Sequence, residues 1–95
     1  MNFNLKPSFE RIYKKLPSYE KQAIDIKIAE LFDYYSKRTF FAGLRVRKLS
    51  GRGNFFEIDT FSNRRILIRK HKDLIEFIAY GNHDEMRRFL KSFSS

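Results

Sequence analysis

The spacing of apolar residues changes near residue 44, and this change limits the folds open to the chain. Between residues 7 and 37 apolar side chains recur every three or four positions, which is the spacing of amphipathic helices. In segments 44–47, 56–59 and 65–69 they alternate with charged side chains, which is the spacing of half-buried strands. Helices followed by a run of strands predict an α+β fold.

The first part of the chain predicts a short strand and two helices. Residues 2–5 alternate polar and apolar side chains and are short enough for an edge strand. A helix over residues 7–17 would be capped by the hydroxyl of Ser8 and ended by Pro17. A longer amphipathic helix would follow, capped by Ser18, so that the two helices form a hairpin whose apolar stripe needs a flat surface to cover.

The remaining segments supply that surface. The three alternating strands form a meander, with turns at 50–54 and 61–63. A fourth strand over 74–80 is apolar on nearly both faces, which predicts a central position, and Asp84 can cap a last helix. The sequence therefore predicts one domain over residues 1–95. It has an N-terminal strand and a helical hairpin packed on one face of a mainly antiparallel four- to five-stranded sheet, and a short C-terminal helix.

Composition and charge limit the kinds of metal, membrane or macromolecule that the chain can be expected to bind. The chain has no cysteine and only two histidines, which excludes a disulfide framework and a thiolate site and argues against zinc, so we expect no metal and no cofactor. Its apolar stretches are too short to span a membrane and no leader opens the chain, so we expect a cytoplasmic protein without a membrane partner. The net charge of +9 favours polyanions, and residues 43–72 hold nine lysines and arginines against two acids.

One face of the predicted sheet should carry most of these charges. If the apolar side chains face the helices, alternation places on the other face Arg45, Arg47, Glu57, Asp59, Arg65 and Arg69. A basic face with aromatic residues nearby suits RNA, because phosphates bind cations and unstacked bases bind aromatic rings. The side chains expected to hold phosphates are Arg45, Arg47, Lys48, Arg52, Arg64 and Arg69. Simple cross-strand ion pairing is the alternative explanation for the two acids.

The same face offers the groups that a metal-independent ribonuclease needs. A base must take the proton of the ribose 2′-OH, a cation must stabilise the charged phosphorane, and an acid must protonate the leaving 5′-oxygen. In that order, the candidates are Glu57 or Asp59, then Arg65, then His83. Histidine suits the last role because its ordinary pKa lies near neutrality. The alternative for His83 is a polar residue in a turn, which is our expectation for His71.

Four strings in the chain resemble, in the correct order, motifs of the RelE/ParE superfamily of bacterial type II toxins. They are "PSFERIYKKLP", "RVRKLSGRGNFFEI", "RRILI" and "IAYGNHDEM", and together they cover nearly the whole chain. The similarity is closest to the RelE and YafQ-like mRNA interferases. It implies cleavage of mRNA in the ribosomal A site and neutralisation by an acidic antitoxin encoded beside the toxin. It also implies a toxin that is monomeric within a hetero-oligomeric complex.

The resemblance also implies roles for individual residues. Arg65 falls on the arginine that contributes to phosphate stabilisation in RelE, and His83 falls on the histidine of the YafQ-like string, the implied general acid. Glu57 and Asp59 lie near positions where RelE has lysines, so a lysine-based mechanism does not carry over. Phe89 stands about where RelE has a functional tyrosine, so no phenol role is expected there.

Two other functions stay open at this point. ParE-type members of the superfamily inhibit DNA gyrase without acting as nucleases, but they generally lack a histidine after the last strand, so His83 favours the ribonuclease. A small basic RNA-binding module with no toxicity would also fit the charge.

Overall fold

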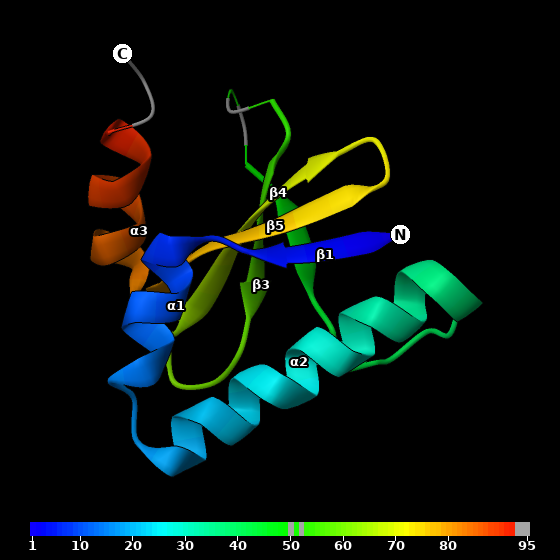
Figure 1. Cartoon of the computed structure of the whole chain (residues 1–95), viewed down its shortest axis with the longest axis horizontal. Coiled ribbons are helices and arrows are strands. Elements are labelled where there is room, and N and C mark those ends of the chain that lie inside the picture. The colour runs from blue at the N-terminus through cyan, green and yellow to red at the C-terminus, as the bar shows by residue number, and fades with distance from the viewer. Residues whose placement is uncertain (50, 52, 93–95) are drawn as a thin grey trace.

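The computed structural model describes residues 1–49, 51 and 53–92, and the predicted α+β fold is confirmed. Five strands form one mixed sheet that carries three helices (Figure 1). In chain order the elements are β1 (Asn2–Leu5), α1 (Pro7–Lys14), α2 (Ser18–Lys37), β2 (Val46–Lys48), β3 (Phe55–Asp59), β4 (Arg65–His71), β5 (Leu74–Gly81) and α3 (His83–Lys91).

The strands follow the order β1-β5-β4-β3-β2. Strands β2 to β5 form the predicted antiparallel meander, and β1 adds a parallel edge strand with Asn2 opposite Leu74. The expectation that the fourth strand of the meander is central is only partly right, because β5 is internal but β4 is the middle strand. Strand β2 starts at Val46, later than the predicted residue 44, because a turn precedes it in which Leu44 N–H donates to the Phe41 carbonyl.

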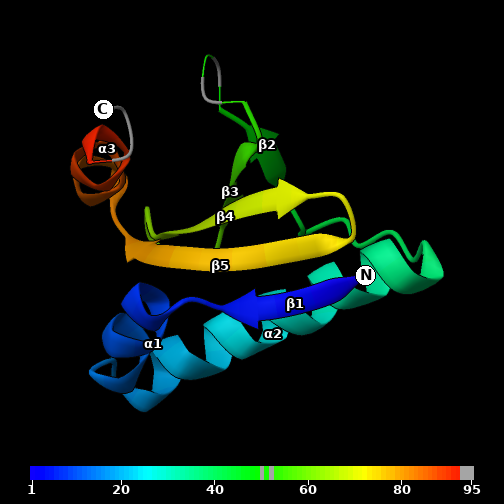
Figure 2. The same cartoon turned by 45° about the horizontal axis from the view of Figure 1, so that its top comes forward.

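Helices cover both faces of the sheet. Helices α1 and α2 lie on one face and α3 lies on the other (Figure 2). The larger core, between the sheet and the first two helices, consists of Phe9, Ile24, Leu31, Ile58, Ile66, Ile68, Ile75, Phe77 and Tyr80. A smaller core under α3 consists of Leu67, Ile78, Ala79, Met86 and Leu90. Because α3 covers part of the second face, β5 is buried on both faces, which explains its continuous apolar sequence.

Ser8 does not cap α1 as predicted. Lys6 occupies the cap position without a side-chain bond, and Pro7 opens the helix, where its missing N–H costs nothing. The Ser8 hydroxyl instead donates to the carbonyl of Ile78 at 2.6 Å. The register of β4 with β5 shifts after Leu67, so that Ile78 is the extra residue of a β-bulge. Ser8 therefore supplies a hydrogen bond that the sheet does not make.

The other two predicted caps are also wrong by one or two residues. Pro17 stands at the cap position of α2, and Ser18 is the first residue inside that helix. Asn82, rather than Asp84, caps α3: its side chain accepts from Glu85 N–H, and the Glu85 carboxylate accepts from Asn82 N–H, both at 2.9 Å. This reciprocal capping box fixes where α3 starts.

Across the part of the chain that the structure describes, no helix combines the length and apolar character needed to cross a membrane.

Candidate active site

His83 is the first residue of α3 and not, as one sequence alternative had it, a residue of a turn. Strand β5 ends at Gly81, which lies opposite Arg65 in the sheet register. The chain then turns through the Asn82 cap and returns across the face opposite α1 and α2. This path places His83 Nδ1 2.9 Å from Arg65 Nη1.

The contact with Arg65 determines which ring nitrogen of His83 carries the proton. A guanidinium has only donors, so Nδ1 of His83 must accept the hydrogen bond. The proton of the neutral ring is then on Nε2, the nitrogen that Arg65 does not contact. In this arrangement His83 presents an N–H group away from the guanidinium.

Two carboxylates complete the surroundings of Arg65. Glu57 Oε1 lies 3.3 Å from Arg65 Nη1, and Asp59 Oδ1 lies 3.7 Å from Arg65 Nε. Arg47, from β2, reaches both acids, with Nη2 2.7 Å from Asp59 Oδ1 and 3.9 Å from Glu57 Oε1. All four predicted catalytic residues therefore meet. With Arg47 they form what we call the Arg65 cluster.

The two carboxylates differ in access to solvent. The Glu57 side chain is 7% exposed and lies between two guanidinium groups. The Asp59 side chain, at the last residue of β3, is 35% exposed. A substrate can reach the oxygens of Asp59, whereas the Glu57 carboxylate is positioned to hold Arg47 and Arg65 in place.

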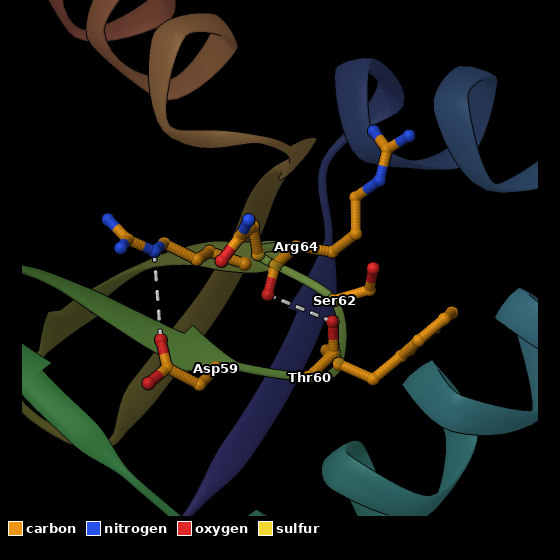
Figure 3. Close-up of a pocket in the computed structure, with 7 residues that line it drawn as sticks. Asp59, Thr60, Ser62 and Arg64 are labelled. Carbon is orange, nitrogen blue, oxygen red and sulfur yellow. Dashed lines mark hydrogen bonds and ion pairs between the residues drawn. The ribbon is translucent and has the colours of Figure 1, made fainter.

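A pocket of about 240 Å³ adjoins the Arg65 cluster (Figure 3). Its lining is one continuous segment, the turn between β3 and β4 with its flanking residues: Asp59, Thr60, Phe61, Ser62, Asn63, Arg64 and Arg65. Within the turn, the Thr60 hydroxyl donates to the Arg64 carbonyl at 3.0 Å. The Arg64 side chain points away from Asp59 in this view, so the Arg64 guanidinium and the Asp59 carboxylate have different neighbours.

Arg64, predicted to hold phosphate, is not brought into the Arg65 cluster. Its Nη1 lies 3.4 Å from Glu85 Oε1 in α3, and its Nε lies 3.9 Å from Glu20 Oε1 in α2. The Tyr80 hydroxyl donates to the same Glu20 oxygen at 2.8 Å. Burial, together with this bond to the carboxylate, raises the pKa of Tyr80 to about 12. Arg64 thus links the helices on the two faces of the sheet.

Arg69 lies on the same face as Arg65 but is engaged elsewhere. Its Nε and Nη2 lie 2.8 and 2.7 Å from Glu76 Oε1, and Lys6 Nζ lies 3.3 Å from Glu76 Oε2. These cations, Arg69 foremost, lower the pKa of Glu76 although burial opposes the change. We call Lys6, Arg69 and Glu76 the Glu76 group.

The remaining predicted phosphate ligands differ in position. Arg45 is exposed, precedes β2 and lies beside the Arg65 cluster, because its carbonyl accepts from Asp59 N–H at 3.3 Å. Lys48 is exposed on β2. Lys48 lies opposite Phe56, which packs against the larger core, so alternation places Lys48 on the other face from Arg47. Arg52 lies outside the described residues.

Helix α3 also carries an exposed arginine, Arg87, that the sequence analysis did not single out. This exposed residue of α3 follows His83 by four positions, so it lies one turn along the same side of the helix. The spacing from His83 was the available signal, but it becomes informative only when His83 is known to be helical. His71 ends β4 and is exposed next to the β4–β5 turn, close to where it was expected.

A metal ion in a protein of this composition would need several histidine or carboxylate ligands close together. Within residues 1–49, 51 and 53–92, no three histidine or carboxylate side chains gather closely enough to hold one.

No protein-family model matches the sequence, and no curated protein matches it either. Solved structures do. The toxin–antitoxin complex of RelB and RelE from Methanococcus jannaschii contains a chain that superposes with a TM-score of 0.70 at 20% identity, covering 90% of this chain and 96% of that one. The fold is that of RelE.

Two further solved structures share this RelE fold. YafQ from E. coli gives a TM-score of 0.61 at 11% identity, covering 90% of this chain and 96% of YafQ. A copper-bound mutant toxin from Helicobacter pylori gives 0.62 at 18% identity, covering 90% of this chain and 98% of that toxin. The predicted resemblance to RelE and YafQ-like toxins is therefore confirmed at the level of the fold. At these identities it does not by itself assign an activity.

Proposed function

We propose that this chain is the toxin of a type II toxin–antitoxin system and that it cleaves mRNA at the ribosome as a metal-independent endoribonuclease. The observation that carries the proposal is the contact of Arg65 with His83 at 2.9 Å, with the carboxylates of Glu57 and Asp59 on the same guanidinium. The RelE fold supports it, because the chains of similar fold are toxins.

Asp59 is the base in this mechanism. Its carboxylate is the more exposed of the two and borders the pocket, so a ribose 2′-OH can approach it. As the proton passes to Asp59, the 2′-oxygen attacks phosphorus and forms the new P–O bond. Glu57, which is buried against Arg65, acts as a positioning residue.

Arg65 and Arg47 stabilise the negative charge that develops on the phosphorane. A phosphate bound by Arg65 draws the guanidinium away from His83 Nδ1, which frees the ring to act as the acid. His83 then protonates the 5′-oxygen as the P–O bond to it breaks. The products are a 2′,3′-cyclic phosphate and a 5′-hydroxyl end.

An acidic antitoxin is the expected partner. The solved RelE chain was captured in a complex with RelB. A net charge of +9 on 95 residues gives an acidic segment a strong electrostatic attraction to this surface. Binding over the Arg65 cluster would block the site.

The test is induced expression in a bacterial host, followed by primer extension on cellular mRNA. We expect growth arrest and new 5′ ends within translated regions, and neither with His83→Gln or Arg65→Ala. The assignment is wrong if both variants still cut mRNA. Arrest with altered DNA supercoiling and intact mRNA would instead identify a gyrase inhibitor, and no arrest at all would favour a plain RNA-binding module.

A further inference from the structure

We infer that the pocket beside Asp59 and Arg65 binds one nucleobase, with Phe61 as its stacking surface. The base would belong to the nucleotide whose phosphate lies on the Arg65 cluster. The inference rests on the proposed function and deepens it, because it gives the site a means of choosing where RNA is cut.

The position and size of the pocket fit this occupant. Asp59 and Arg65 belong both to the pocket and to the Arg65 cluster, so a phosphate on Arg65 leaves the rest of its nucleotide beside the opening. The volume of about 240 Å³ is below the range of roughly 300–1,000 Å³ typical of pockets that enclose a whole drug-sized ligand. It suits one part of a nucleotide.

The aromatic side of the pocket is solvent-accessible and held in place. Phe61 is 38% exposed, and its ring centroid lies 5.9 Å from that of Tyr19, with the rings inclined at 63°. Tyr19, in the first turn of α2, is 63% exposed. An exposed ring beside arginines is the combination that binds unpaired bases in single-stranded nucleic acids.

Two backbone hydrogen bonds hold the turn that carries Phe61. Arg64 N–H donates to the Phe61 carbonyl at 2.9 Å, and Thr60 N–H donates to the Arg64 carbonyl at 3.0 Å. Ser62 and Asn63 occupy the two central positions with φ of 50° and 64°, and both are exposed. The Asn63 amide has both donors and an acceptor, so it can bind the edge of a base that stacks on Phe61.

Another exposed aromatic residue borders a pocket without charged lining residues and therefore provides a control for Phe61. Phe40 is 79% exposed and borders a pocket of about 160 Å³ whose other lining residues are Tyr34, Phe41, Leu44 and Val46. None of these lining residues is charged, so this pocket offers an aromatic surface without a cation in its lining.

The experiment titrates the purified full chain with AMP, CMP, GMP, UMP and ribose 5-phosphate, followed by NMR chemical shifts. We expect at least one nucleotide to bind about tenfold more tightly than ribose 5-phosphate, as stacking of one base allows. Phe61→Ala should remove that difference, while Phe61→Tyr and Phe40→Ala should keep it. The shifts of the variants also report whether they fold.

Each other result overturns the inference. If ribose 5-phosphate binds as well as every nucleotide, the pocket holds no base; if Phe61→Ala leaves the preference intact, the base lies elsewhere. Failure of the proposed function is distinguishable, because nucleotide binding would then persist in a chain that cuts no mRNA in cells. Arg65→Ala separates the two contributions: it should weaken ribose 5-phosphate and nucleotides by the same factor.

Discussion

Two groups of charges on one face of the sheet use arginine in opposite ways. In the Glu76 group, Arg69 directs two nitrogens to one carboxylate oxygen, at 2.7 and 2.8 Å. In the Arg65 cluster, the contacts of Arg65 with its two carboxylates are longer, 3.3 and 3.7 Å, and its shortest contact is to the ring of His83.

The difference separates a structural ion pair from a candidate site. Arg69 makes two short charge-assisted contacts with one carboxylate oxygen of Glu76, and such contacts are worth more than ordinary hydrogen bonds. Arg65 divides its donors among three partners, so a phosphate can replace them at lower cost. Charge alone does not distinguish the two arginines; the geometry of their partners does.

The largest effects should come from breaking the Arg65 cluster. Arg65→Ala or His83→Gln should reduce mRNA cleavage by about 10²–10⁴-fold, the usual contribution of one electrostatic or acid–base group. Arg69→Ala is the matched control and should leave cleavage within about threefold, because Arg69 serves the fold. Quantitative primer extension measures all three; equal losses at Arg65 and Arg69 would abolish the distinction.

Variants of the two carboxylates in the Arg65 cluster test which of them is the base. Asp59→Asn removes the base and should lower cleavage by about 100-fold or more. Glu57→Gln keeps a hydrogen-bond acceptor for Arg65 and should cost roughly tenfold, mainly through misplacement of the guanidinium. The reverse order of effects, in the same cleavage assay, would make Glu57 the base.

The Glu76 group should show its effect in stability. Glu76→Gln should lower the free energy of unfolding near pH 7 by about 1–3 kcal/mol. The pKa of Glu76 is lowered in the folded chain, so its stabilisation is complete above the ordinary value of 4.5 and is lost as the pH falls through the folded-state pKa. Urea titrations at several pH values should show the variant and the parent chain converging in acid.

The matched control for that measurement is Asp33→Asn. The Asp33 carboxylate is 36% exposed and lies 3.7 Å from Lys37 Nζ, which is 69% exposed. An exposed pair of this kind contributes about 0.5 kcal/mol or less. A loss as large as that of Glu76→Gln would show that burial is not what distinguishes the Glu76 group.

The smallest effects should follow from exposed cations that are not members of the Arg65 cluster. Arg45→Ala and Lys48→Ala should each weaken RNA binding about two- to threefold and flatten its salt dependence by roughly one charge. Lys37→Ala, on α2, should change neither. Binding of a short RNA to the His83→Gln chain, measured over a range of salt, gives both quantities.

The strands were predictable because alternation is a strong and local signal. Alternation in β3 and β4 placed Glu57, Asp59 and Arg65 on one face, and the sheet register then set them side by side. The caps were not predictable in the same way. Ser8 has the right residue type for a cap, but its hydroxyl is needed at a bulge 70 residues away, which no local pattern indicates.

Two neighbouring arginines show the same limit on what a local sequence pattern can predict. Arg64 and Arg65 are neighbours in the sequence and equally basic, yet Arg64 joins Glu20 and Glu85 while Arg65 meets His83. Arg64 ends the β3–β4 turn and Arg65 begins β4, and which of the two meets His83 depends on where α3 returns. That path is set by the Asn82 cap, and the sequence pattern suggested Asp84 instead.

The parallel pairing of β1 with β5 has a consequence for the order of folding. Residues 2–5 are synthesised about 70 positions before their partners, residues 74–77, and His83 comes later still. Strand β1 cannot pair until β5 has been synthesised. The Arg65 cluster likewise stays incomplete until His83 has been added. Such distant contacts also make folding slow. A chain proposed to act on mRNA under translation is thereby prevented from assembling its site while it is itself half-translated.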